Sequence, residues 1–140
     1  MQSTITKRTL AALFIAAVGL VLLRAFDPAR SWIFPPCPVH YLTGCYCPGC
    51  GSLRAIHALL HGDVHRAWAM NPLTIVLLPF VAYGLFSEIL VGLRGRGLPQ
   101  PRLSSSAIYA LGCMIVLFGV IRNLPLVPFS LLAPGAMLGF

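Results

Sequence analysis

Residues 72–93 read PLTIVLLPFVAYGLFSEILVGL, and this stretch decides the fold class of the chain. The run contains a single charged side chain, Glu88. A helix needs about 20 mostly apolar residues to cross the hydrocarbon core of a bilayer, so the stretch predicts a membrane-spanning helix. Two more runs, at 9–26 and 107–124, are apolar over most of their length and end near an arginine, and we expect them to span as well.

The overall composition agrees with a lipid environment. Hydrophobic residues make up 58% of the 140-residue chain and charged residues only 9%, and the mean hydropathy is +0.86. A soluble domain carries about 25% charged residues. A chain this short cannot bury so much apolar surface in a core of its own. We therefore predict an all-α integral membrane protein with about three transmembrane helices, folded as a single membrane domain over residues 1–140.

The net charge of +7 does not indicate nucleic-acid binding. The ten basic residues lie scattered near the predicted helix ends and form no dense patch interleaved with aromatic side chains, so we expect no nucleic acid as a partner. Basic residues flanking spans direct membrane insertion instead, and membrane lipids are the expected partners. The compact basic loop at 94–102 favours a cytoplasmic N-terminus, with the segment between the first two spans outside.

That segment has a distinct organisation. Residues 35–51 contain repeated Pro and Gly, which predicts an irregular loop that holds the Cys and His residues. Amphipathic patterns then predict two short interfacial helices at 52–61 and 63–70. We expect caps at four positions, Ser52, Gly62, Asp63 and Asn71. The Pro-rich apolar tail at 125–140 cannot form a regular span, so we expect it to lie along the interface or over the loop.

The loop carries the sequence CPVH at 37–40 and CPGCG at 47–51. Each motif places two potential ligands three positions apart, a spacing typical of tetrahedral zinc sites. Pro48 restricts the turn, and Gly49 and Gly51 permit a positive φ. The predicted zinc ligands are Cys37, His40, Cys47 and Cys50, with Cys45 as a substitute.

The same cysteines also suit thiol redox chemistry. Cys47 and Cys50 precede the start of a predicted helix, and Arg54 lies one turn inside it; both features stabilise a thiolate. In this alternative Cys47 attacks, Cys50 resolves, and Cys37 with Cys45 can form a second pair. A purely structural disulfide, or small residues in a tight loop, is a third interpretation that the sequence leaves open.

A different set of polar residues suggests anion binding. Arg54 and His57 lie on the first interfacial helix, and Arg122 with Asn123 lies at the end of the third span. With three spans, that end returns to the side of the Cys/His loop, so Arg122 is expected to approach Cys47, Cys50 or a bound anion. A small carrier or lipid-binding protein is the corresponding alternative.

The motifs together resemble a family of bacterial membrane proteins labelled domain of unknown function 2752. The shared pattern is TG at 43–44, CPGCG at 47–51, RA at 54–55, GD at 62–63, NP at 71–72 and RN at 122–123. The resemblance covers residues 35–123; Leu53, where the family often has threonine, and the additional Cys45 depart from it. It implies a multi-pass protein of the bacterial plasma membrane and supplies no activity.

Three short spans and a small loop leave little room for a substrate pocket. We therefore expect an accessory or scaffold module with a structural zinc site, which works with a membrane protein partner or as a homo-oligomer, rather than a stand-alone enzyme.

Overall fold

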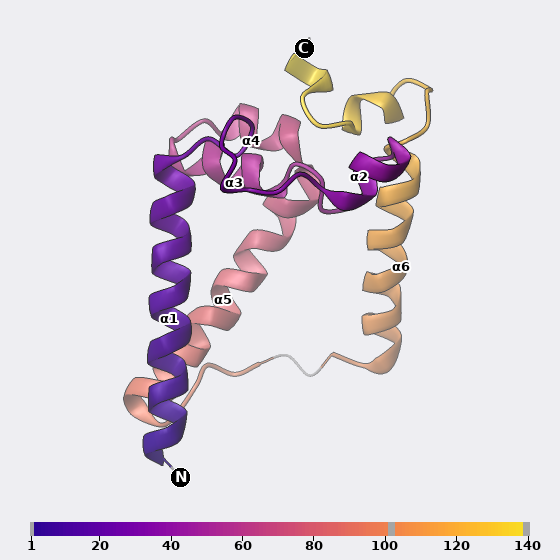
Figure 1. Cartoon of the computed structure of the whole chain (residues 1–140). Coiled ribbons are helices and arrows are strands. Elements are labelled where there is room, and N and C mark those ends of the chain that lie inside the picture. The colour runs from indigo at the N-terminus through magenta and orange to yellow at the C-terminus, as the bar shows by residue number, and fades with distance from the viewer. Residues whose placement is uncertain (1, 101–102, 139–140) are drawn as a thin grey trace.

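The structure is a computed structural model that describes residues 2–100 and 103–138. Throughout these residues the regular secondary structure is helical, which confirms the all-α prediction. Three long helices extend from the same side of a cap of short helices (Figure 1). The long helices are α1 (Gln2–Ala25), α5 (Pro72–Arg94) and α6 (Ser105–Ile121). The cap contains α2 (Pro38–Thr43), α3 (Ser52–Leu60), α4 (Val64–Met70) and the 3-10 turns η1 (Phe129–Leu132) and η2 (Ala136–Leu138).

The long helices differ in how well they meet the requirement for a membrane span. Within the described part of the chain, α5 alone is both long and apolar enough, and only 6% of its most apolar window is buried. The apolar part of α1, Thr9–Ala25, and the whole of α6 are shorter. One helix of this kind is weak evidence for a membrane protein, and the three spans remain a prediction.

The predicted caps are mostly confirmed. The side chain of Asp63 accepts a hydrogen bond of 2.8 Å from the Arg66 amide at the start of α4. The side chain of Asn71 accepts one of 3.2 Å from the Thr74 amide at the start of α5. Gly62 has a φ of +80°, as expected for the residue that ends α3.

The cap of α3 differs from the prediction. Gly51 occupies the N-cap position, and Ser52 is the first helical residue. The Ser52 hydroxyl instead lies 2.7 Å from the Thr74 hydroxyl on α5. The prediction that Ser52 caps α3 was wrong, because its side chain pairs with a residue on α5 rather than with its own helix.

A short helix lies inside the segment predicted to be irregular. Helix α2 starts with a proline in its first turn and ends at Gly44, whose φ is +72°. The Gly44 amide donates a 2.9 Å hydrogen bond to the carbonyl of His40. A first-turn Pro and a left-handed Gly are ordinary helix boundaries, so the sequence carried a signal for α2 that was interpreted as turn.

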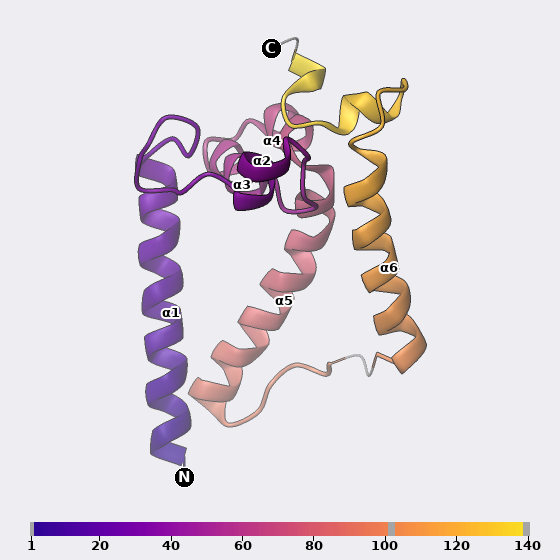
Figure 2. The same cartoon turned by 45° about the vertical axis from the view of Figure 1, so that its right-hand side comes forward.

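The C-terminal tail contacts α4, whereas the predicted locations were the interface or the Cys/His loop. The Gly135 amide donates a hydrogen bond of 3.1 Å to the Ala69 carbonyl of α4. At the opposite end of the molecule lie the N-terminus and the connection between α5 and α6 (Figures 1 and 2). In both views α6 stands well apart from α1, so its attachment to the cap holds it in place.

A three-sulfur candidate metal centre

The CPGC loop at 47–50 folds as a tight turn that leads directly into α3. The Cys50 amide donates to the Cys47 carbonyl at 3.0 Å. Gly51 then adopts a φ of +86°, and a Cβ atom at this position would lie 2.6 Å from the Met70 carbonyl oxygen. Gly51 is therefore required both for its backbone conformation and for close packing against the end of α4. The expected use of a positive φ is confirmed for Gly51, whereas Gly49 does not adopt one.

Three cysteine sulfurs converge where this loop meets α2. The Sγ atoms of Cys37 and Cys47 are 3.4 Å apart, and those of Cys47 and Cys50 are 3.2 Å apart. All three sulfur atoms lie within 4.8 Å of one another. Cys37 comes from the N-cap of α2, which brings it across ten residues to the CPGC loop. The arrangement can hold a metal ion through three thiolate ligands.

The thiols of the cluster have different acidities. Hydrogen bonding from the His40 backbone and from the Cys47 side chain lowers the pKa of Cys37 from 9.0 to about 7. Burial raises the pKa of Cys50 to about 12, and its hydrogen bond with Cys47 adds to the shift. A metal ion binds thiolates, so binding at neutral pH would displace the proton that Cys50 otherwise keeps.

Arg122 lies beneath the loop and is only 1% exposed. Its NH1 nitrogen donates to the carbonyl oxygens of Cys47, Pro48 and Cys50 at 3.1, 3.4 and 3.2 Å. The guanidinium carbon also lies 5.0 Å from the centre of the Phe118 ring. The Nε and NH2 nitrogens of Arg122 are buried without a hydrogen-bond partner. The expectation that this residue approaches the cysteine loop is confirmed.

Two asparagines complete the attachment. The side-chain nitrogen of Asn71, a fully buried residue, donates to the carbonyls of Pro48 and Cys50 at 3.0 and 3.2 Å. The Asn123 amide accepts from the Tyr46 backbone nitrogen at 2.7 Å and donates to the Tyr46 carbonyl at 2.8 Å. We call Asn71, Arg122 and Asn123 the loop clamp, since each holds the backbone of residues 46–50.

The close approach of α6 to the loop depends on a glycine. A Cβ atom added at Gly119 would lie 2.7 Å from Cγ and 2.9 Å from Cδ of Pro48. Such distances are well inside van der Waals contact, so only a residue without a side chain fits. By contrast, a Cβ at Gly112, two turns earlier in α6, would meet nothing within 4 Å.

The remaining predicted ligands lie outside the sulfur cluster. The ring of His40 stacks on that of Tyr46, with centroids 4.5 Å apart. Cys45 is exposed, and its amide donates to the Thr43 hydroxyl at 3.1 Å. Within the described ranges, three of the predicted ligands lie close enough together to share a metal ion, and these are Cys37, Cys47 and Cys50. His40 and Cys45 are not part of this group.

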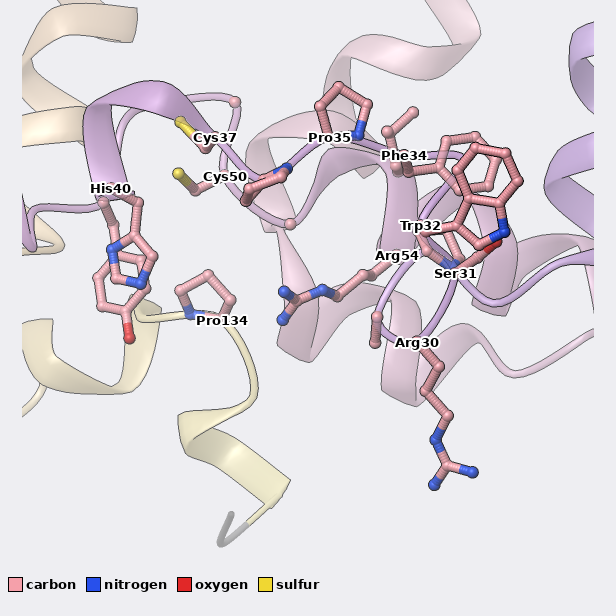
Figure 3. A pocket seen from close by; sticks show the side chains of 17 residues that line it. Arg30, Ser31, Trp32, Phe34, Pro35, Cys37, His40, Cys50, Arg54 and Pro134 are labelled. Atoms are coloured by element: carbon pink, nitrogen blue, oxygen red, sulfur yellow. The ribbon is translucent and has the colours of Figure 1, made fainter. Parts of the chain in front are cut away.

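The residues predicted to bind an anion lie in three different surroundings. Arg122 is buried under the loop. His57 lies on the far side of α3, where its Nδ1 is 2.6 Å from the Leu23 carbonyl of α1. Arg54 lines a cavity of about 770 Å³ beside the cluster (Figure 3). Asn123, the fourth member, is engaged with the Tyr46 backbone.

The sequence predicts Asn71 only as a helix cap, and it predicts no part in the site for Gly119 or Tyr46. All three touch the CPGC loop or its neighbours. A signal existed for Asn71, because an asparagine before the proline of an apolar helix offers amide hydrogens that the cap itself does not use. Gly119 carried no local signal, since its role depends on which residue faces it.

Comparison with known proteins confirms the resemblance at the sequence level. The model of the family described as "Protein of unknown function (DUF2752)" matches residues 37–85. This range begins at the first cysteine of the cluster and ends within α5. No curated protein and no solved structure matches the chain.

Proposed function

We propose that this chain is a small membrane-embedded accessory or scaffold protein whose cap is held together by a structural zinc ion on Cys37, Cys47 and Cys50. His40 is the proposed fourth ligand, since it lies one turn after Cys37 and lines the same cavity as Cys37 and Cys50. When bound, zinc would supply a cross-link between the start of α2 and the CPGC loop. The zinc ion itself would not take part in redox reactions, because zinc has a single stable oxidation state in proteins.

The observation that carries this proposal is the buried charge of Arg122. The chain contains only three acidic residues, Asp27, Asp63 and Glu88. None of them is among the groups that interact electrostatically with Arg122, which are Cys50, Cys47 and Tyr46. A buried guanidinium without an opposite charge is strongly unfavourable. Three thiolates on a divalent ion carry a net charge of −1, which would balance Arg122.

The neutral states of the cysteines provide no such balance. Fully protonated thiols and a disulfide would both leave the guanidinium uncompensated. A metal-free cluster supplies the same single negative charge only when Cys37 is a thiolate, which at its pKa of about 7 holds for part of the molecules at neutral pH. Zinc is also the metal that thiolate-rich sites with tight-turn spacing most often bind. Charge balance and ligand softness therefore favour the same ligand set.

The membrane part of the proposal rests on the arrangement of the long helices. Helices α1, α5 and α6 extend from one side of the cap, and the N-terminus and the α5–α6 connection lie at the other end (Figure 1). Three spans of a bacterial plasma membrane would have this arrangement. We propose a cytoplasmic N-terminus and an extracytoplasmic cap, because the basic loop near Arg94 and Arg96 then lies on the cytoplasmic side.

Metal content and free-thiol count on the detergent-purified protein test the zinc site. We expect about one zinc per chain in the wild type and none in a Cys47→Ser/Cys50→Ser variant. A Cys45→Ser/Cys113→Ser variant is the matched control, since both residues lie outside the cluster, and it should keep the metal. Metal-free wild-type protein with an intact helical fold would overturn the proposal.

A second candidate function is thiol–disulfide exchange by Cys47 and Cys50. The observation that favours it is the 3.2 Å distance between their sulfurs, which a small movement would close to a disulfide bond. In that case the purified protein would lack metal and two free thiols. A Cys50→Ala variant would then accumulate a mixed disulfide between Cys47 and a partner, and zinc-loaded protein without such a product would exclude this function.

A further inference from the structure

A cavity of about 770 Å³ lies beside the sulfur cluster, between the connector after α1 and the start of α3. Its volume falls in the range of small-molecule sites in proteins. One side is apolar and includes Phe34, which is half-buried, together with the exposed Leu53 and Trp32, whose side chain is 93% exposed. The opposite wall carries Cys37, Cys50 and Pro134 (Figure 3). The walls therefore come from segments distant in the sequence, which the fold of the cap brings together.

Apart from the cysteines of the metal centre, the charged side chains that line this cavity are both arginines. Arg30 and Arg54 are among the lining residues, and the lining includes no Asp or Glu. Figure 3 shows Arg54 reaching toward the wall formed by Pro134, whereas Arg30 extends away from it. Within the described part of the chain, the Arg54 side chain forms no hydrogen bond or ion pair. Its planar fork of donors is therefore free to bind a ligand.

The backbone adds to the positive potential. Helix α3 begins at the cavity wall, and its first turn has no capping side chain. Unpaired amides at a helix start favour a negative charge nearby. Arg54 and the start of α3 consequently act on the same space.

We propose that this cavity is a binding site for a ligand that carries a phosphate group and an apolar part, with Arg54 as the residue that contacts the phosphate. Arginine matches phosphate geometry through two parallel hydrogen bonds. The apolar wall of Trp32, Phe34 and Leu53 would receive the rest of the ligand. The site goes beyond the structural zinc ion, and it rests on the proposed membrane location only for the source of the ligand.

Two sources can offer this chemistry. If the long helices span the membrane, the cavity lies at the level where a phospholipid headgroup ends. A soluble phosphate ester from the adjoining compartment has the same anionic group. Reconstitution into nanodiscs separates the two sources, because the lipid and the soluble ligand can then be changed independently.

The experiment uses the full chain with Trp68→Phe, so that Trp32 at the cavity is the remaining tryptophan. Its fluorescence is recorded in nanodiscs of a phosphate-free galactolipid during titration with hexyl phosphate, a soluble ester with a phosphate group and an apolar part. It is then compared with nanodiscs that contain phosphatidylglycerol and no added ester. A response to the ester assigns the site to a soluble ligand, and a response to phosphatidylglycerol assigns it to a lipid headgroup.

Variants at Arg54 test the proposed contact. Arg54→Gln should weaken binding at least about tenfold, because it removes the charge of the two hydrogen bonds that the guanidinium donates to the phosphate. Arg66→Gln is the matched control, because Arg66 is an exposed arginine on α4 outside the cavity lining, and it should leave binding unchanged. Equal binding by the two variants, or no response to either probe, would overturn the proposal.

A second pair of variants tests the cavity by adding a negative charge rather than by removing a hydrogen-bond donor. Leu53→Glu places a carboxylate in the lining and should abolish binding of the anion. Val64→Glu places one at an exposed position outside it and should not. Zinc content, measured on the same samples, should stay unchanged throughout. Loss of phosphate binding with zinc retained would thus separate this site from the metal centre.

Discussion

The cap and the long helices are held in place by different means. The cap and the loop clamp together contain most of the buried side chains, including Cys50, Ala55, Ala67, Asn71 and Arg122. The long helices bury few residues, and only 6% of the most apolar window of α5 is buried. In the cap, directional hydrogen bonds fix residues that are far apart in the sequence. Along the helices, much apolar surface is left without a partner inside the chain, and such contacts as exist are not directional.

Directional polar contacts therefore decide the structure of the cap, and hydropathy decides that of the long helices. The loop clamp joins the two regions, because it connects the long helices to the CPGC loop of the cap. Its members lie at the start of α5 and at the end of α6. Changes in the clamp should therefore have larger effects than comparable changes along the helices.

The largest effect is expected for Arg122→Met. This change removes the hydrogen bonds to the carbonyls of the CPGC loop and leaves those oxygens buried. We expect a loss of about 3 kcal/mol in the free energy of unfolding of the cap. Thermal unfolding followed by circular dichroism in detergent measures it. Arg96→Met, at an exposed arginine, should leave the transition unchanged, and equal transitions for the two variants would refute the role of Arg122.

Exchanging Asn and Asp at the starts of α4 and α5 should change stability less than Arg122→Met does. The effect is expected only at Asn71, at the start of α5. Asn71→Asp keeps the oxygen that caps α5 but loses the hydrogens donated to Pro48 and Cys50. We expect a loss of about 2 kcal/mol in the free energy of unfolding. The reverse exchange at Asp63 should be nearly neutral, because Asn and Asp cap equally well. Equal effects at the two sites would show that Asn71 is only a cap.

A methyl group should be costly on one glycine of α6 and harmless on another. Gly119→Ala places a Cβ against Pro48, where overpacking costs about 1–2 kcal/mol. Gly112→Ala meets open space and should be neutral or stabilising by up to about 1 kcal/mol. Because pressure on Pro48 would loosen the CPGC loop, the measurement is the fraction of zinc that each variant retains in the presence of a chelator. Equal retention by both variants would mean that α6 does not press on the loop.

The last prediction concerns the reactivity of the thiols in zinc-free protein, where we expect the smallest effect on stability. Because the pKa of Cys37 is lowered to about 7 and that of Cys50 is raised to about 12, iodoacetamide at pH 7 should modify Cys37 and spare Cys50. The lowered pKa also means that Cys37 stabilises the fold fully above pH 9, its unperturbed value, and that this contribution is lost as the pH falls through 7. Peptide mass spectrometry in a Cys45→Ser/Cys113→Ser background measures the modification, and faster labelling of Cys50 would contradict it.

Much of the fold followed from local sequence signals. Asp63 and Asn71 were identified as caps because an acceptor side chain before an apolar or proline-led helix has a local function. The all-helical architecture followed from three apolar runs. The convergence of Cys47 with Cys50 needed only the spacing of a tight turn. Each of these interactions closes within a few residues, so a single sequence suffices to predict it.

The rest depends on contacts between distant segments. The three carbonyls bound by Arg122 are separated from it by 72 to 75 residues. The predicted topology of three spans indicated that Arg122 lies near the CPGC loop. It did not indicate that Arg122 binds the backbone oxygens of this loop. His40 was selected by spacing alone, and spacing could not reveal its stacking on Tyr46. The empty space around Arg54 likewise arises only after the connector folds over α3.

The distance in sequence between Arg122 and the CPGC loop also has a consequence for synthesis. The loop leaves the ribosome long before α6 does, so its carbonyls cannot receive the guanidinium until α6 has been synthesised. Chains that end before Ser104 should therefore bind zinc weakly, even though every cysteine of the cluster is present. A zinc-loaded cap would then distinguish chains that contain α6 from shorter ones, a difference that quality-control proteases could recognise.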